Sequence, residues 1–437
     1  MSTETIAAIA TAAGVGGVGI VRISGPRAIA IAAAVLEIQE ARLDRRVRIG
    51  WARDAEGKRL DQVLAFAMRA PASFTGEDVA ELQGHGGAVN LQKLLACVIE
   101  RGARIAEPGE FTRRAVQNGK LDLVRAEALL GVIHAGSERA WRLAQANLTG
   151  ALGAAVERLE QRALAVLAEL EGWIDFPDED LQTASAGWIR QEVSDLAAEC
   201  DRIAGGFRHG RAVTQGISVA LVGPVNAGKS SLLNALVGTE RALVSASPGT
   251  TRDWLEVSDI WHGVAVTLVD TAGVRTTRDP IEQRGIELGE QRVAAADVVV
   301  VLNDGEAPWD DGVRFGGRAL VVRSKADLGR DVRDALCTSA TTGQGLDELR
   351  RKALELAGVA DREGSEQAFL TTSRQCELCT SARDAFAAAL RAWDHRHPPE
   401  LMAVELRHAA QSLAQLRGLE VGERVLDQVF ARFCIGK

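Results

Sequence analysis

The sequence lacks any apolar run long enough to cross a lipid bilayer. A transmembrane helix needs about 20 consecutive, mostly apolar residues, whereas the apolar runs here are much shorter, and Val298–Leu302 has the length of a strand. The N-terminal residues also lack the basic start and the long apolar stretch of a secretory signal. We therefore expect a cytoplasmic protein with no part in a membrane.

Cysteine is scarce, and basic charge is not in excess. Six cysteines scattered over 437 residues do not make a disulfide framework. Cys376 and Cys379 have CxxC spacing, but no second Cys/His pair follows at metal-ligand spacing, and their surroundings predict a helix. Because 51 Lys and Arg oppose 59 Asp and Glu, the net charge is −8. A contact with nucleic acid therefore needs a local basic patch or a partner's charge.

The length of the chain and the patterns of apolar residues along it predict several domains. A chain of 437 residues exceeds a typical domain of about 150 residues nearly threefold. Short β-rich runs and two helical patterns indicate an α+β domain over residues 1–118. Apolar residues three and four positions apart predict long helices over 119–212 and again over 363–437. Alternating strands and helices over 213–362 predict a doubly wound α/β domain, inserted into a helical domain that both flanks build.

A phosphate-binding loop follows the first strand of the α/β region. Residues 223–230, GPVNAGKS, match the pattern G-x-x-x-x-G-K-[ST], with a strand before them and a helical run after them. Glycine lets backbone N–H groups converge on phosphate oxygens, while Lys229 supplies a positive charge and the Ser230 hydroxyl can hold Mg²⁺. The predicted phosphate contacts are Asn226, Ala227, Gly228, Lys229, Ser230 and Ser231.

Two further segments fit the same triphosphate site. A β-run ends in Asp270, which can hold the metal through water, and Thr271, Ala272 and Gly273 follow it, with a glycine N–H placed to sense the γ-phosphate. Between this segment and the phosphate loop lies Gly249-Thr250-Thr251-Arg252-Asp253, where a threonine hydroxyl can complete the Mg²⁺ shell. Loss of the γ-phosphate is expected to release that loop.

The base-recognition segment departs at one position from the usual pattern. Ser324-Lys325-Ala326-Asp327 resembles the Asn-Lys-x-Asp element of GTPases, with Ser324 in place of Asn. Asp327 is expected to pair with the N1 and N2 donors of guanine and to reject adenine. Ser339, Ala340 and Thr341 stand where the last guanine-contacting loop belongs, although a plain turn before the following helix also fits them.

Hydrolysis requires a group that positions water. In Ras-like proteins a Gln after Asp-x-x-Gly does this, but Val274 occupies that position here. Glu282 is our candidate for the catalytic residue, and the alternative is a solvated glutamate on a helix face.

The whole chain resembles the tRNA-modification GTPase family MnmE (also called TrmE). Beyond the GTPase elements, the resemblance is carried by residues 19–25 (GIVRISG), 74–79 (FTGEDV), 81–87 (ELQGHGG), 118–123 (NGKLDL), 174–177 (IDFP) and 433–437 (FCIGK). It implies an N-terminal α+β domain that dimerises and binds a 5-formyltetrahydrofolate-type folate, a helical domain, and an inserted Ras-like P-loop GTPase domain.

The resemblance also implies roles for particular residues. Folate contacts fall on Arg22, Glu81, Lys120 and Lys437. The catalytic glutamate falls on Glu282, and Mg²⁺ on Ser230 and Thr251. K⁺ falls on Asn226, Ser245, Ser247 and Thr250. The implied GTP-binding segment is Ser245, Ala246, Ser247, Pro248, Gly249, Thr250 and Thr251, and Cys434 is a possible functional thiol.

The function implied is a potassium-stimulated GTPase. With the flavoprotein MnmG (GidA), such a protein adds a carboxymethylaminomethyl or aminomethyl group to C5 of the wobble uridine of certain tRNAs. A GTP-switched ribosome-assembly factor of the Era/Der type is the alternative, because it shares the phosphate loop and the Asp-Thr-x-Gly segment. An assembly factor has no need of the folate contacts or of the Cys-x-Gly-Lys terminus, and we find no KH-like G-x-x-G loop after the GTPase region.

Overall fold

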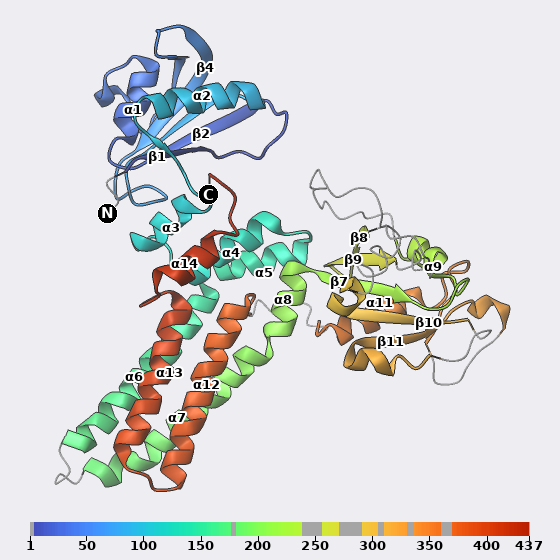
Figure 1. Cartoon of the computed structure of the whole chain (residues 1–437). Coiled ribbons are helices and arrows are strands. Elements are labelled where there is room, and N and C mark those ends of the chain that lie inside the picture. Colours follow the sequence, from blue (N-terminus) through green and yellow to red (C-terminus); the bar gives the residue numbers. More distant parts are fainter. Residues whose placement is uncertain are drawn as a thin grey trace. The chain divides into compact units, whose positions relative to one another are not determined.

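The chain folds into two compact units, which are described separately. Unit 1 comprises Met1–Glu127 and Arg417–Lys437, and unit 2 comprises Ala128–Leu416. The computed structural model describes residues 4–175, 181–237, 256–270, 291–304, 310–329, 336–359 and 369–436, with only the backbone described at 181–185, 256 and 270. Figure 1 labels the elements along the chain.

Unit 1 is built on a six-stranded mixed sheet. Its strand order is β3-β4-β5-β2-β1-β6, and every neighbouring pair is antiparallel except β1 and β6. The strands are β1 (Ile6–Ile9), β2 (Val18–Ser24), β3 (Arg48–Arg53), β4 (Arg59–Met68), β5 (Val79–His85) and β6 (Arg104–Ile105). A loop that contains Gly14, Gly16 and Gly17 connects β1 to β2.

Helices cover one face of this sheet (Figure 1). Strand side chains such as Val21, Val63 and Leu82 pack with apolar residues of α1 (Ala28–Leu36) and α2 (Ala88–Glu100). On the other side of the pleat, Ile49 is 72% exposed, and Trp51 and Leu64 are each 40% exposed. Unit 1 also contains η1 (Glu40–Arg42), α3 (Glu110–Gln117) and α14 (Glu423–Phe430), and α4 (Leu123–His134) begins in it.

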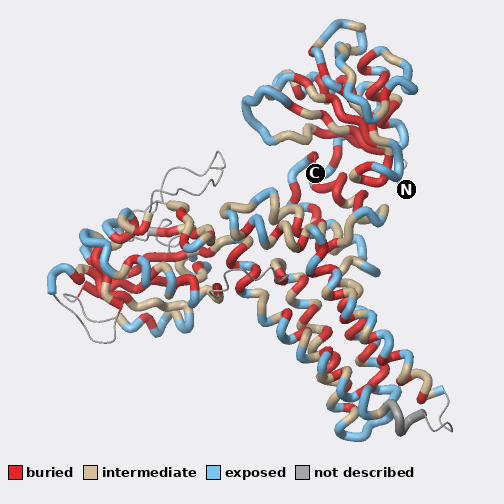
Figure 2. The backbone as a smooth tube through the Cα atoms, turned by 180° about the vertical axis from the view of Figure 1, so that it is seen from behind, coloured by how far each residue is buried: buried red, intermediate tan, exposed pale blue. Residues whose placement is uncertain are grey.

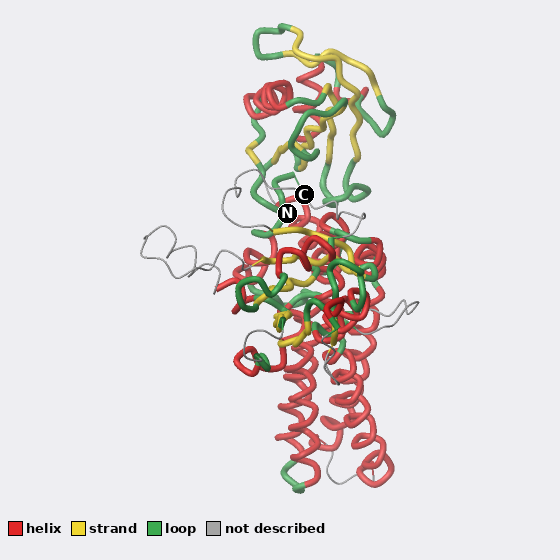
Figure 3. The backbone as a smooth tube through the Cα atoms, turned by 90° about the vertical axis from the view of Figure 1, so that its right-hand side faces the viewer, coloured by secondary structure: helices red, strands yellow, loops and turns green. Residues whose placement is uncertain are grey.

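The helical part of unit 2 contains long antiparallel helices, which run beside one another in Figure 3. Its helices are α5 (Glu138–Leu148), α6 (Ala151–Asp175), α7 (Leu181–Gly205), α8 (Phe207–Gln215), α12 (Ser373–Asp394) and α13 (Pro399–Arg417). The ring centroids of Trp173 on α6 and Trp393 on α12 lie 6.0 Å apart. Buried stripes along these helices appear red in Figure 2, as expected for amphipathic helices that share a core.

The second part of unit 2 is a sheet with the order β12-β11-β10-β7-β9-β8. All pairs are parallel except β8 and β9. The strands are β7 (Ile217–Val222), β8 (Glu256–Trp261), β9 (Val264–Asp270), β10 (Val298–Asn303), β11 (Ala319–Arg323) and β12 (Leu336–Cys337). The associated helices are α9 (Lys229–Leu236), η2 (Val313–Arg318), η3 (Ala326–Leu328) and α11 (Leu346–Leu356).

Both faces of this second sheet are buried, because successive apolar side chains of a strand point to opposite faces. Val298 and Val300 belong to the core that α9 and α11 share, whereas Val299 and Val301 belong to a core on the opposite face. Sheets buried on both faces read as continuous apolar runs, which explains the strand sequence of β10. The predicted fold class is therefore confirmed, and the antiparallel edge strand β8 is a feature that the sequence reading did not anticipate.

The predicted domain boundaries remain predictions, and the two units divide the chain in a different way. The sequence reading assigns 363–437 to the helical domain, whereas contacts group Arg417–Lys437 with the N-terminal residues. Gly436 shows this grouping, because a Cβ placed on it would lie 2.3 Å from the carbonyl oxygen of Ile9. The last residues therefore pack against the end of β1.

Candidate functional site

The phosphate loop has the strand–loop–helix geometry of an anion site. It leaves the carboxyl end of β7 and enters α9, whose first residue is Lys229. Asn226 and Gly228 have φ values of 66° and 90°, and Gly223 has φ 154° with no room for a Cβ, which would lie 2.7 Å from the Leu302 carbonyl oxygen. Positive φ values in a glycine-rich loop before a helix are typical of loops whose backbone N–H groups bind phosphate.

The Lys229 side chain forms hydrogen bonds with the backbone of this loop. Its ammonium donates to the carbonyl oxygens of Gly223 at 2.9 Å and of Pro224 at 2.8 Å. A phosphate oxygen is a charged acceptor and makes a stronger bond to ammonium than a neutral carbonyl does. Ser230 and Ser231 are exposed in the first turn of α9, directly after Lys229. The predicted contacts from Asn226 to Ser231 therefore lie together in this one loop.

The base-recognition residues lie at the carboxyl ends of β11 and β12. Asp327 lies in η3, and its Oδ1 accepts a 2.7 Å hydrogen bond from the hydroxyl of Ser339, which is fully buried. That hydrogen bond, followed by backbone and Thr341 contributions, lowers the pKa of Asp327 below its ordinary value. The carboxylate is thus oriented and ionised, as an acceptor for two guanine donors must be.

Two site residues have no counterpart among the sequence predictions. Asn303 ends β10, accepts from the backbone N–H of Asp310 at 2.8 Å and donates to the carbonyl of Asp310 at 2.9 Å. The next residue, Asp304, is 5% exposed and lies 3.6 Å from the Lys325 ammonium. Polar residues directly after a fully apolar strand, at the edge where parallel strands end, are the signal that would have identified them.

Several predicted site residues lie outside the described residues, so their placement stays a prediction. They are Ser245, Ala246, Ser247, Pro248, Gly249, Thr250, Thr251, Thr271, Ala272, Gly273, Glu282 and Lys437. Asp270 is the last residue of β9 and has only its backbone described. Its strand is parallel to and paired with β7, so the backbone of Asp270 lies at the same sheet edge as the phosphate loop.

Unit 1 contains a candidate site of its own, a pair of charged side chains on its sheet. Arg22 on β2 and Glu81 on β5 are cross-strand partners, with Nε to Oε1 at 2.9 Å and side-chain exposures of 20% and 9%. The guanidinium also lies 5.9 Å from the ring centroid of Phe111, and Gln83 donates to the second oxygen of Glu81 at 3.4 Å. Two of the four predicted folate contacts are therefore in direct contact.

Lys120 lies in a loop that packs against residues 74–78. Its ammonium donates to the carbonyl oxygen of Pro71 at 3.1 Å, and a Cβ on Gly76 would lie 3.2 Å from its side chain. Asn118 donates to the carbonyl oxygen of Thr75 at 2.8 Å. The sequence segments FTGEDV and NGKLDL thus lie together, although residues 80–117 separate them in the sequence.

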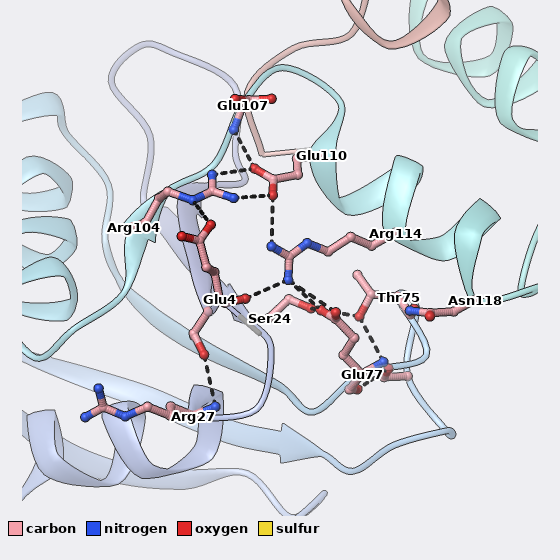
Figure 4. A network of polar contacts seen from close by, with 12 residues as sticks. Glu4, Ser24, Arg27, Thr75, Glu77, Arg104, Glu107, Glu110, Arg114 and Asn118 are labelled. Atoms are coloured by element: carbon pink, nitrogen blue, oxygen red, sulfur yellow. Dashed lines mark hydrogen bonds and ion pairs between the residues drawn. The ribbon is translucent and has the colours of Figure 1, made fainter. Parts of the chain in front are cut away.

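A buried ionic network fixes residues 74–78 (Figure 4). Arg114 on α3 donates to Glu77 at 3.0 Å and to Glu110 at 2.9 Å, and its side chain is 4% exposed. Ser24, at the end of β2, donates to Glu77 at 2.8 Å. Buried charges are costly unless they are paired, and here each has a partner. The network therefore ties the loop to the strand that carries Arg22.

The C-terminal segment of unit 1 also reaches this region. The backbone N–H of Gly109, which precedes α3, donates to the carbonyl oxygen of Cys434 at 3.4 Å, and the Cys434 side chain is exposed. Gly436 lies against Ile9 and Ala10. The residue before Lys437 therefore lies at the end of β1, the strand that pairs with the one that carries Arg22.

The described residues contain neither a membrane-spanning helix nor a ready metal cluster. No helix among them is long and apolar enough to cross a bilayer. No group of three His, Cys, Asp or Glu side chains within the described ranges could hold a metal ion. All six cysteines, each in the described part, are free thiols.

These features define a class. A phosphate loop between β7 and α9, on a mostly parallel sheet with an oriented Asp327 at the same edge, is the architecture of a P-loop GTPase. The additional sheet and helices of the chain point to a specialised member of that class.

Comparisons with known proteins identify the family. The family model described as the MnmE helical domain matches residues 123–434, and the model described as the GTP-binding protein TrmE N-terminus matches residues 5–120. The tRNA modification GTPase MnmE of Symbiobacterium thermophilum is 40% identical over 464 residues, covering 100% of both chains. That of Synechococcus sp. strain RCC307 is 43% identical over 448 residues, covering 99% of this chain and 98% of the other. The chain belongs to the MnmE family of tRNA modification GTPases.

Among solved structures, the G domain of the T. maritima FeoB iron transporter is similar to part of the chain. It is 25% identical, the match covers 32% of this chain and 98% of that chain, and the TM-score is 0.26.

Proposed function

We propose that this chain is a GTPase that acts in the modification of tRNA. The observation that carries the proposal is similarity along the full length to proteins named tRNA modification GTPase MnmE, together with a phosphate loop and an oriented Asp327. Its finer form is addition of a carboxymethylaminomethyl or aminomethyl group to C5 of the wobble uridine, together with the flavoprotein MnmG (GidA). The net charge of −8 agrees with tRNA binding that rests largely on a partner's surface.

GTP hydrolysis in this proposal uses groups of the GTPase module. Lys229 and the N–H groups of the phosphate loop hold the β- and γ-phosphates, and Asp327 holds guanine. Glu282 orients the attacking water. Ser230 and Thr251 hold Mg²⁺, whereas Asn226, Ser245, Ser247 and Thr250 hold K⁺. When bound, these cations supply positive charge beside the phosphates, where negative charge develops during transfer.

The polar pair of unit 1 is proposed to bind a 5-formyltetrahydrofolate-type folate. Glu81 offers acceptors to the amino and N–H donors of a pterin, and Phe111 lies under the Arg22 guanidinium. Arg22, Lys120 and Lys437 can neutralise the glutamate carboxylates of the folate tail. The residues present fit such a ligand, because a carboxylate can accept from its N–H donors and cationic side chains can pair with its carboxylates.

A homodimer through unit 1 is part of the proposal. The uncovered sheet face carries Ile49, Trp51 and Leu64, all substantially exposed. Apolar side chains grouped on one sheet face are a recognised mark of protein interfaces.

The test is mass spectrometry of wobble nucleosides from a strain that lacks this chain. We expect the wobble uridine of that strain to be unmodified. The wild-type gene should restore the modification, and a gene that carries Lys229→Ala should not. Glu282→Ala is expected to bind GTP, to lose most hydrolysis and to fail to restore the modification, and wild-type turnover is expected to be several-fold faster in K⁺ than in Na⁺.

Fully modified wobble uridine in the deletion strain would reject the tRNA function. Equal GTP turnover in the two salts would remove only the potassium site, and unchanged hydrolysis by Glu282→Ala would assign the water to another group.

A further inference from the structure

Ser324 occupies a junction between the base-recognition loop and the phosphate loop. It directly follows β11, is 6% exposed, and its backbone N–H donates to the carbonyl oxygen of Asn303 at 2.9 Å. The residues after it, Lys325 and Asp327, form the base-recognition segment. Its side chain points toward the phosphate loop, as the next contacts show.

The single proton of the Ser324 hydroxyl is already committed. The hydroxyl donates to the carbonyl oxygen of Ala227, in the phosphate loop, at 2.8 Å, and the carbonyl oxygen of Asn303 lies 3.3 Å away. Ala227 is fully buried, so this hydrogen bond stabilises a carbonyl that lies inside the protein. A serine hydroxyl has one proton to give, and here backbone oxygens receive it.

Guanine presents two kinds of group to a binding site. Its N1 and N2 donate, and the oriented carboxylate of Asp327 meets that requirement. Its N7 and O6 accept, so each needs a donor from the protein or from water. An asparagine amide at position 324 would carry two protons and could serve a loop carbonyl and a base acceptor together. The hydroxyl of Ser324 can serve only one of them.

We propose that Ser324 is a positioning residue that holds the phosphate loop to the base-recognition loop and leaves the N7 acceptor of guanine without a side-chain donor from this position. The chain then recognises guanine through its N1, N2 and O6 edge and is indifferent to N7. This inference rests on the proposed GTP site, and it removes a base contact that an asparagine at position 324 could make.

The test compares GTP with 7-deaza-GTP, in which a C–H group replaces N7. Calorimetric titration of the full chain in Mg²⁺ and K⁺ is expected to give dissociation constants within about twofold of each other, because no neutral hydrogen bond is lost. Ser324→Asn keeps a donor for Ala227 and gains one for N7. We expect that variant to prefer GTP over 7-deaza-GTP by about fivefold to tenfold.

Two further variants separate positioning from general stability. Ser324→Ala leaves the Ala227 carbonyl without its donor and is expected to weaken both nucleotides by about the same factor, roughly tenfold. Ser218→Ala is the matched control, because the Ser218 hydroxyl donates to Asp297 at 2.8 Å on the same sheet, near the start of β7. That control is expected to leave both affinities unchanged.

A wild-type preference for GTP over 7-deaza-GTP of tenfold or more would overturn the inference and leave the GTPase function intact. Binding of neither nucleotide would overturn the proposed function, and the inference with it. The wild-type comparison alone decides the question if a variant does not fold.

Discussion

Glu110 is the residue where burial and charge oppose each other most clearly. Burial raises the pKa of its carboxyl, but hydrogen bonds from Arg104, the Glu107 backbone and Arg114 outweigh burial and lower the pKa to about 2 from 4.5. A carboxyl whose pKa falls on folding stabilises the native state above its unfolded pKa. That stabilisation is complete above about pH 5 and is lost as the pH falls from 4.5 toward 2.

We therefore expect Glu110→Gln to destabilise unit 1 by about 2–4 kcal/mol at pH 7, because two guanidinium groups each lose a charged partner. The deficit relative to wild type should shrink steadily between pH 5 and pH 2. Hydrogen exchange of peptides from residues 4–127, read by mass spectrometry, measures the local free energy of opening.

Glu138→Gln is the matched control for this experiment. Glu138 pairs with Arg142 one helical turn away, but both side chains are more than 70% exposed. An exposed pair contributes little, so a change below about 0.5 kcal/mol is expected. A pH-independent deficit in Glu110→Gln would show that lost packing, and not the charge, accounts for its effect.

At the scale of single residues, the sequence predicts the chemical role of a residue better than it predicts which residues that residue contacts. Lys229 and Asp327 are recognisable because phosphate and guanine each demand one residue type at a fixed spacing. The partners of Asp327 and Lys325 are less visible, since Ser339 and Asp304 reach them only through the folding of separate strands. No local sequence pattern records such a contact.

At the scale of elements, α12 shows how a helix start is specified. Thr372 is its N-cap and accepts from the backbone N–H of Gln375, while the Gln375 side chain accepts from the backbone N–H of Thr372, which completes a capping box. Gln375 is 1% exposed and also accepts from Thr371. The start of this helix is therefore fixed by side chains and not by packing alone.

Thr372→Ala is expected to lower the free energy of unfolding by about 1 kcal/mol, because one orphan backbone donor loses its acceptor. Urea unfolding followed by far-UV circular dichroism measures the shift in midpoint. Ser373→Ala, an exposed neighbour inside the first turn, should change stability by less than about 0.5 kcal/mol. Equal effects of the two substitutions would argue against a capping role.

Elements in which apolar residues recur at a regular spacing were predictable, and elements without such a spacing were not. The helix expected after Thr341 is α11, Leu346–Leu356, and the CxxC segment lies within α12 as expected. The edge strand β8 has the sequence EVSDIW, which mixes acidic and apolar residues, and it is stabilised by pairing with β9. Tertiary pairing of this kind outweighs local propensity.

At the scale of the whole molecule, both ends of the GTPase module meet on one helix. Gly210 on α8 has no room for a Cβ, which would lie 2.3 Å from the carbonyl oxygen of Leu370. Gln215, the last residue of α8, donates to the carbonyl oxygen of Thr371 at 3.1 Å. The chain therefore enters the module and returns from it at neighbouring points, as expected for an inserted domain.

Replacement of residues 216–368 by a short Gly/Ser linker is thus expected to leave a folded helical domain. Asn147, which is 1% exposed and donates to the carbonyl oxygen of Phe369 at 2.9 Å, should keep the rejoined segment in place. Circular dichroism and size-exclusion chromatography test this expectation, and a cooperative thermal transition would support it. Loss of helical signal or aggregation would show that the module is required for folding.

The return of the last segment to unit 1 has a consequence for synthesis on the ribosome. Residues 4–127 emerge first, yet the helix and tail that complete their unit belong to Arg417–Lys437. While the intervening unit is being translated, the C-terminal residues that pack against the end of β1 have not yet been made. The end of β1 in the nascent sheet therefore stays exposed during this time. We expect this half-finished intermediate to be the stage at which the newborn chain most needs chaperone protection.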